Sequence, residues 1–180
     1  MPCAISIGRL INCKDQVGGI QKVYFCNYTE LSIVTDAATN VVTDLGAITV
    51  YEYDVQPETA SLSVTINSSK ENGTTFYEQT SDLTLHKLTA LDEDNVRLLA
   101  WGRPQIFVLD NNNQVFLLGA LHGNALNTGT IQTGTAFGDM SGYQLSFTGK
   151  EQQGYYQFPA ASVTDPFSAL TGLVTIVQGT

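Results

Sequence analysis

The chain has 180 residues, of which 43% are hydrophobic, so it is long and apolar enough to bury a core and is not globally disordered. Only 14% are charged, and the balance is acidic, with 17 Asp and Glu against 8 Lys and Arg for a net charge of −9. Eight dispersed basic residues form no clustered patch, which argues against nucleic-acid binding. This low charge content is consistent with a surface that faces other subunits. It is also consistent with a monomer whose surface is rich in Thr, Asn, Gln and Ser.

The first part of the chain contains all three cysteines, Cys3, Cys13 and Cys26. Their number is odd and their spacing matches no zinc motif, so we interpret them as reduced thiols. The start lacks a basic segment followed by a long apolar one, and we expect no signal peptide. No stretch reaches about 18 continuous apolar residues, so no membrane span is expected.

The first half of the chain is predicted to be β-structure. Residues 20–28 and 47–55 are rich in β-branched and aromatic residues and favour strands. Residues 31–46 fit either two short strands around Ala38-Thr39-Asn40 or an irregular arm. Residues 61–69 and 75–88 alternate apolar and polar positions around the turn signal Asn72-Gly73, which predicts a long hairpin, either in the core or projecting from it.

The only predicted helix covers residues 89–101. Thr89 is a suitable N-cap, and Asp92 and Glu93 lie in the first turn, where the helix dipole favours anions. Gly102 and Pro104 end the helix. We expect it to pack through an apolar side that consists of Leu91, Val96, Leu98, Leu99 and Trp101.

The second half returns to strands. Residues 105–110 and 114–119 flank the turn-prone residues 111–113 and are apolar on both faces, which predicts central strands. Residues 129–140 are rich in Gly and Thr and are interpreted as a crossing segment. Residues 142–149 alternate, and after a turn at 164–172 the chain ends in a strand at 173–178. No repeat or linker interrupts the chain, so we expect one domain over residues 1–180, with N-terminal and hairpin extensions.

No cluster of groups that supports catalysis emerges, and no enzyme activity, metal or cofactor is predicted. His86 and His122 lack partners in sequence and are interpreted as structural. The carboxylates of residues 92–94 are explained by the helix start. Residues 110–113 faintly resemble a calcium loop but lack its Gly and Glu, so a hairpin turn is favoured. Tyr155-Tyr156 can stack on a sugar or base, although packing is the more common use.

The chain resembles tail-tube-like structural proteins of tailed bacteriophages, in particular phages of Bacteroidetes hosts. The resemblance covers roughly residues 60–153 and rests on the order of three segments: LTALDEDNVRLLAWGRP, QIFVLDNNNQVFLLG and GTIQTGTAFGDMSGYQLSFTGKEQQ. Its most characteristic parts are GDMSGY and FTGKE. It implies a mainly β fold, a sandwich of two antiparallel sheets with one flanking helix and a long hairpin arm.

The resemblance also implies a function. Subunits would self-associate into hexameric rings that stack into a tube in the virion tail, after synthesis in the host cytoplasm, and would contact other tail or connector proteins but no membrane. Six subunits at −9 carry six times −9, or −54, per ring. An acidic lumen would conduct genomic DNA without binding it. A head–tail connector, tail terminator or baseplate ring protein is the alternative reading.

A different class remains open, a β-sandwich glycan-binding module that uses Tyr155, Tyr156 and Trp101. For assembly, the expected interface is the hairpin tip, supported by residues 31–46 and the C-terminal strand, because long antiparallel arms offer free backbone edges. The tip consists of Ser69, Lys70, Glu71, Asn72, Gly73 and Thr74.

Overall fold

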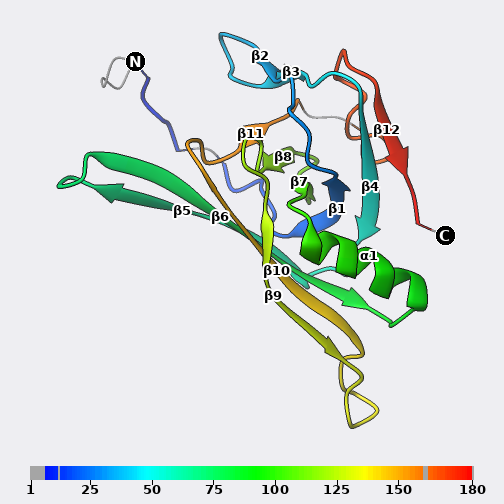
Figure 1. The fold of residues 1–180 in the computed structure, drawn as a ribbon. Coiled ribbons are helices and arrows are strands. Elements are labelled where there is room, and N and C mark those ends of the chain that lie inside the picture. The colour runs from blue at the N-terminus through cyan, green and yellow to red at the C-terminus, as the bar shows by residue number, and fades with distance from the viewer. Residues whose placement is uncertain (1–6, 12, 160–161, 180) are drawn as a thin grey trace.

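The computed structural model describes residues 7–11, 13–159 and 162–179. Within these ranges the chain forms twelve strands and one helix (Figure 1). In chain order they are β1 (Ile20–Cys26), β2 (Val34–Thr35), β3 (Val42–Asp44), β4 (Ile48–Asp54), β5 (Ala60–Ser69), β6 (Thr74–His86), α1 (Ala90–Trp101), β7 (Gln105–Asp110), β8 (Val115–Leu118), β9 (Ala125–Gln132), β10 (Gly142–Glu151), β11 (Tyr156–Gln157) and β12 (Val174–Val177). Cys3 lies outside the described residues.

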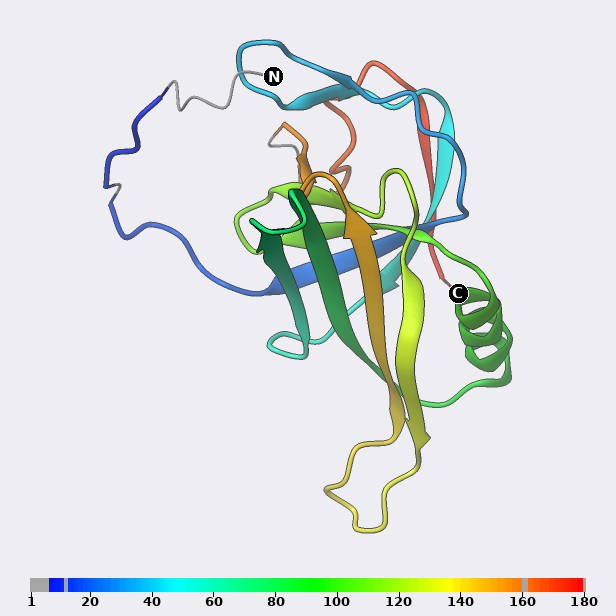
Figure 2. The same ribbon diagram turned by 60° about the vertical axis from the view of Figure 1, so that its left-hand side comes forward.

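Two large sheets form a β-sandwich with one helix, as predicted. The first sheet has the strand order β11-β8-β7-β1-β4-β12, and the second has the order β5-β6-β10-β9. The strands of the second sheet run across β1 (Figure 2). The expectation of purely antiparallel sheets is wrong at one edge, because β12 pairs with β4 in parallel. β4 and β12 are far apart in the chain, so no tight turn joins them and requires an antiparallel pairing.

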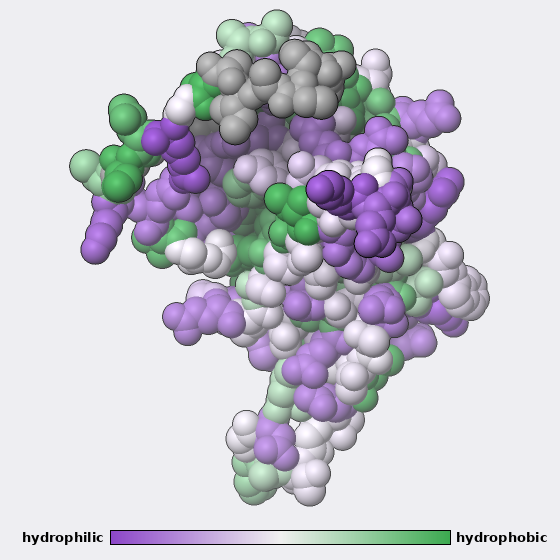
Figure 3. All heavy atoms as spheres, turned by 90° about the vertical axis from the view of Figure 1, so that its left-hand side faces the viewer, coloured by the Kyte–Doolittle hydropathy of each residue, from purple (hydrophilic) through white to green (hydrophobic). Residues whose placement is uncertain are grey.

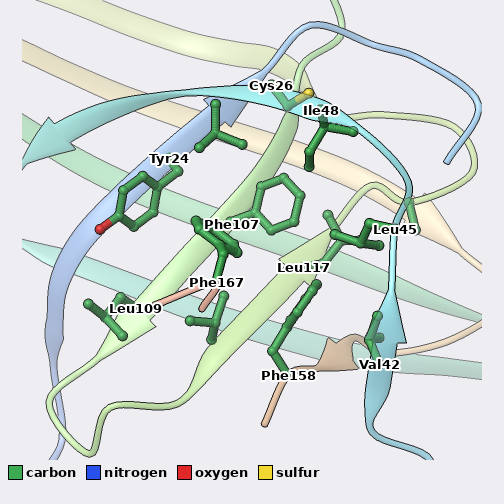
Figure 4. Close-up of a cluster of buried hydrophobic side chains, with 13 residues drawn as sticks. Tyr24, Cys26, Val42, Leu45, Ile48, Phe107, Leu109, Leu117, Phe158 and Phe167 are labelled. Carbon is green, nitrogen blue, oxygen red and sulfur yellow. The ribbon is translucent and has the colours of Figure 1, made fainter. Parts of the chain in front are cut away.

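The middle strands of the first sheet are buried on both faces, as the apolar runs of 105–110 and 114–119 predict. Ile106 and Val108 of β7 point to the second sheet and α1, where they join one hydrophobic cluster. Phe107 and Leu109 point the other way and join a second cluster with Phe158 and Phe167 (Figure 4). The first sheet is therefore the middle layer of the molecule.

A layer of short segments covers the outer face of the first sheet. Residues 31–46 form the strands β2 and β3, one of the two alternatives left by the sequence. The Asp36 carboxylate accepts hydrogen bonds from the backbone of Ala38 (2.7 Å) and Thr39 (2.9 Å), and these bonds lower its pKa. Val42 and Leu45 are buried beneath this ribbon. Part of the segment expected to reach a neighbour thus closes the protein's own core.

The helix begins and ends as predicted, but its packing differs. The Thr89 hydroxyl accepts a hydrogen bond from the Asp92 amide, and the Gly102 amide donates to the Leu98 carbonyl. Of the helix residues, Val96 alone is buried and Leu99 is partly packed. The expected apolar side is wrong for Leu91, Leu98 and Trp101, which are exposed. Only one narrow strip of this short helix reaches the second sheet, so these side chains remain outside.

The interpretation of residues 129–140 as a crossing segment is also wrong. The first of these residues complete β9, which pairs along β10 from Ala125 to Gln132 and then turns back through residues 133–141. β9 is an edge strand with mostly exposed residues. Thr and Gly on an exposed edge produce no apolar alternation, so the sequence signal for this strand was weak.

Candidate assembly surfaces

The predicted interface lies at the tip of a projecting hairpin. β10 pairs with β6 only between Tyr77 and His86, so the outer part of the β5–β6 hairpin extends beyond the sheet (Figure 1). Ser69 ends β5 and Thr74 begins β6, with residues 70–73 as a four-residue connection. Gly73 has a φ of 61°, a conformation that glycine adopts without strain. Lys70, Glu71, Asn72 and Gly73 are exposed, so the tip is accessible to a partner.

The sequence did not indicate a second projecting hairpin. β9 and β10 continue into the loop 133–141 beyond the end of β6, because Gly142 is paired with His86, the last residue of that strand. This loop and the β5–β6 tip therefore extend from opposite ends of one sheet (Figure 2). The Asp139 carboxylate accepts backbone hydrogen bonds from Thr135 (2.8 Å) and Ala136 (2.7 Å), which lower its pKa.

The outer face of the second sheet is polar. Residues that alternate with the buried ones along β5, β6 and β10 are Ser61, Ser63 and Thr65, then Glu78, Thr80, Asp82 and Thr84, then Gln144, Ser146, Thr148 and Lys150. The Ser146 hydroxyl donates to Asp82 at 2.6 Å. Figure 3 shows the side of the molecule on which the β5–β6 hairpin projects, where hydrophilic residues gather around the hairpin. The face carries hydroxyl, amide and carboxylate groups with one lysine, Lys150, whose Nζ lies 5.5 Å from the centre of the exposed ring of Phe76 near the hairpin tip.

The N-terminal arm, which we define as residues 7–11 and 13–17, stands away from the body (Figure 2). Asn112 clamps its root: the Asn112 side chain accepts from the Val17 amide (2.9 Å) and donates to the Val17 carbonyl (2.8 Å). Asn111 donates to the Gly18 carbonyl at 2.7 Å. These asparagines belong to the turn that was weighed as a calcium loop. In the same turn, the Asp110 carboxylate accepts hydrogen bonds from the backbone amides of Asn112 and Gln114, which confirms the hairpin-turn interpretation.

A groove lies between α1, the end of β4 and residues 177–179, with a volume of about 670 Å³. Its apolar wall includes Tyr51, Tyr53, Leu98, Leu99 and Val177. Its polar groups include Glu52, Asp92 and Asn95. The guanidinium of Arg103 lies 3.8 Å from the ring centre of Tyr28, also in the lining. We call this feature the α1–β4 groove; no sequence pattern indicated it, because its walls come from four distant segments.

Buried polar side chains hold the loop that follows β8. Gln79 of β6 accepts from the Gly119 amide (2.8 Å) and donates to the carbonyls of Gln153 and Gly154. The Glu151 carboxylate accepts from the amides of Leu121 and His122. It also lies 3.1 Å from Nδ1 of His122, so this histidine has a structural partner.

The aromatic residues considered for glycan binding lie on separate elements. Trp101 is the last residue of α1 and is 78% exposed, with the Arg97 guanidinium 5.5 Å from its ring centre. Tyr155 packs edge-to-face on Phe116, whereas Tyr156 pairs in β11 and contacts the outer core cluster. The structure does not combine them into one stacking platform.

Other candidate chemistry is also dispersed. His86 is exposed at the end of β6. Cys13 is an exposed free thiol and Cys26 a buried one, and burial raises the pKa of Cys26. In the described parts of the chain, no group of three or more His, Cys, Asp or Glu residues is arranged to hold a metal ion. No helix in these same parts is both long enough and apolar enough to cross a membrane.

No family model matches the chain, and no curated protein matches it. A chain of a solved structure described as "Virion of native gene transfer agent (GTA) particle" is similar with a TM-score of 0.38 and 9% sequence identity, over 60% of this chain and 89% of that chain. A likeness at this level establishes neither a common fold nor a common function.

Proposed function

We propose that this protein is a structural component of a phage-like virion, a tail-tube subunit that forms stacked, hexameric rings around a DNA channel. The observation that carries the proposal is the pair of hairpins that leave opposite ends of the second sheet. A subunit with a hairpin at each end can contact the ring above through one hairpin and the ring below through the other. Such head-to-tail contacts can repeat without limit along an axis.

The polar outer face of the second sheet supports the channel. It presents Glu78 and Asp82 against the single cation Lys150, and most of its other side chains carry hydroxyls. Hydrated hydroxyls and a small excess of carboxylates give DNA phosphates no attractive contact, so DNA would slide past this wall. We assign this face to the lumen.

Purified protein at high concentration tests the proposal. Light scattering coupled to size-exclusion chromatography should detect hexamers or larger assemblies, and negative-stain images should show rings and tubes. A monomer that never associates would contradict the proposal. Single rings that refuse to stack would favour the connector, terminator or baseplate position instead.

The hairpin tip has its own test. Deletion of residues 69–74 removes the reach of the β5–β6 hairpin but no buried side chain, so the protein should fold and lose stacking. Circular dichroism would report the fold, and electron microscopy would report tube length. The matched control replaces Lys70 and Glu71 by serine and keeps the hairpin length. This variant should still form tubes if stacking depends on the length of the hairpin rather than on its charges. Unchanged tubes after the deletion would refute this role.

A further inference from the structure

We propose that the N-terminal arm of one copy binds as an extended segment in the α1–β4 groove of a second copy. This inference rests on the ring assembly proposed above and names one contact within it. The contact would join neighbouring subunits through surfaces other than the two hairpins.

The described residues of the arm expose several large apolar side chains. Ile7, Leu10, Ile11 and Val17 are all exposed, with Ile11 at 101%. Four large apolar side chains in one short segment are costly to leave in water, at about 25 cal/mol for each Å² of apolar surface. The asparagine clamp at Val17 and Gly18 nevertheless fixes where the arm leaves the body. An anchored root with an uncovered apolar segment is typical of an arm that docks elsewhere.

The α1–β4 groove provides what an extended segment requires. Its wall exposes Leu98 and Tyr51 beside the partly buried Tyr53. Among the described residues, the pairing of β12 with β4 ends at Val177 and Tyr51. The side of β4 that faces away from β1 therefore has no strand partner in this part of the structure over Glu52, Tyr53 and Asp54. A free sheet edge next to an apolar wall is suited to addition of a strand.

Charge also favours this occupant. The arm carries Arg9 and Lys14 against Asp15, so it is net positive in a chain with a net charge of −9. The groove lining holds the carboxylates of Glu52 and Asp92 and the guanidinium of Arg103, which already stacks on Tyr28. Lys22 pairs with the Glu52 carboxylate at 2.7 Å, so Asp92 is the carboxylate of this lining that is open to a further positive charge. The basic arm would be attracted to this carboxylate, whereas an acidic segment of a second copy would be repelled.

Geometry favours a neighbour over the same chain. The arm leaves the body near Ile20, at one end of β1, whereas Phe25 and Cys26 at the other end line the groove. The end of the groove at Phe25 and Cys26 is therefore about 20 Å from Ile20 along this strand, at roughly 3.3 Å per residue. The arm extends from the side of the molecule opposite α1 (Figures 1 and 2). A contact between the arm of one copy and the groove of the next is head-to-tail, and it closes into a ring when the rotation allows.

Disulfide trapping between two distinguishable chains tests the contact. The donor chain keeps Cys13 in the arm and carries Cys3→Ser. The acceptor chain carries Cys3→Ser, Cys13→Ser and Asn95→Cys, which places a thiol on the groove wall, and a tag that changes its mass. After mixing at high concentration and mild oxidation, a mixed disulfide between the two chains is expected on a non-reducing gel. Because the two cysteines are on different chains, a fold-back within one chain cannot produce this band.

Two controls define the result. An acceptor without Asn95→Cys measures any reaction with the buried Cys26, and an acceptor with Ser63→Cys in place of Asn95→Cys measures random collision on the outer sheet face. A band at least tenfold stronger for Asn95→Cys than for either control supports the proposal. Equal bands overturn it. If rings form but no specific band appears, the arm–groove contact is refuted and the proposed ring assembly stands. If the protein is a monomer and no band appears, both proposals are refuted.

A second measurement uses the arm itself. Ile11→Asp should lower the assembled fraction in sedimentation at least tenfold at a fixed concentration, because it places a carboxylate on the apolar arm. The fold should not change, since Ile11 contacts solvent. The matched control is Val163→Asp, which alters another exposed apolar side chain outside the arm and the groove. Equal assembly of both variants and the parent chain would overturn the proposal.

Discussion

At the scale of single residues, buried polar groups divide into those that are bonded and those that are not. Gln79 and Ser81 are neighbours on the inward face of β6, and both are almost fully buried. Gln79 bonds three backbone groups in two loops. Within the described residues, the Ser81 hydroxyl has no hydrogen-bond partner. The two positions should therefore respond to substitution in opposite ways.

Replacement of Gln79 by methionine keeps the side-chain volume but leaves the Gly119 amide and the Gly154 carbonyl without their hydrogen-bond partner. We expect the free energy of unfolding to fall by about 2–4 kcal/mol, because each unpaired buried group costs roughly 1–3 kcal/mol. The matched Ser81→Ala variant removes an unpaired hydroxyl and should be neutral or more stable by up to about 1 kcal/mol. Urea denaturation measures both. A loss of stability in Ser81→Ala equal to that in Gln79→Met would contradict this account.

At the scale of elements, the two hairpins are supported differently. The β5–β6 tip depends on strand pairing and on the conformation of Gly73, whereas the loop 133–141 depends on one carboxylate, Asp139. Phe137 in this loop is fully exposed, so its ring does not order the loop. The geometry of the second hairpin should therefore be sensitive to the charge state of Asp139.

Acid should release this loop. The amides of Ala136 and Thr135 lower the pKa of Asp139 below its ordinary value of 3.8. A lowered pKa in the folded state means that the loop is stabilised above pH 3.8 and that this stabilisation is lost as pH falls through the folded pKa. Amide NMR signals of Thr135 and Ala136 should titrate with a midpoint below 3.8.

The Asp139→Asn variant provides the control for this titration. It removes the titrating group, so the acid-dependent change at Thr135 and Ala136 should disappear. A midpoint at or above 3.8 in the parent protein would show that the two backbone bonds do not stabilise the ionised carboxylate.

At the scale of the whole molecule, the assignment of the lumen depends on which face avoids DNA. The variant Glu78→Lys with Asp82→Lys converts the outer face of the second sheet from weakly acidic to basic. Assembled variant should retard duplex DNA in a gel at about 50 mM salt and release it at higher salt, because phosphate contacts release counterions. The parent assembly should not retard DNA.

A matched variant places the same charges elsewhere. Glu30→Lys with Glu58→Lys alters two exposed acids outside this sheet face. If the proposed face lines the channel, DNA retained by the Glu78 and Asp82 variant should be protected from nuclease. DNA bound through the lysines introduced at positions 30 and 58, on the outside of the assembly, should instead be digested. Equal digestion of both complexes would refute the assignment.

The sequence by itself determined the local elements whose signals are short-range. The Thr89 cap, the Asn72-Gly73 turn, the alternation of 61–69 and the two-sided apolar runs of 105–110 and 114–119 each depend on neighbours within a few residues. For this reason the helix, the long hairpin and the central strands were predictable, as was the mainly β class.

Only the tertiary structure decided which surfaces remain open. β9 exists because β10 pairs with it, and the exposure of Leu98 and Trp101 follows from where the second sheet meets α1. The α1–β4 groove and the clamp of Asn112 on Val17 join segments far apart in the chain. Such contacts depend on the placement of whole elements, which no local pattern records. The sequence therefore predicted one long hairpin and an N-terminal extension, whereas the fold also provides a second hairpin and a groove.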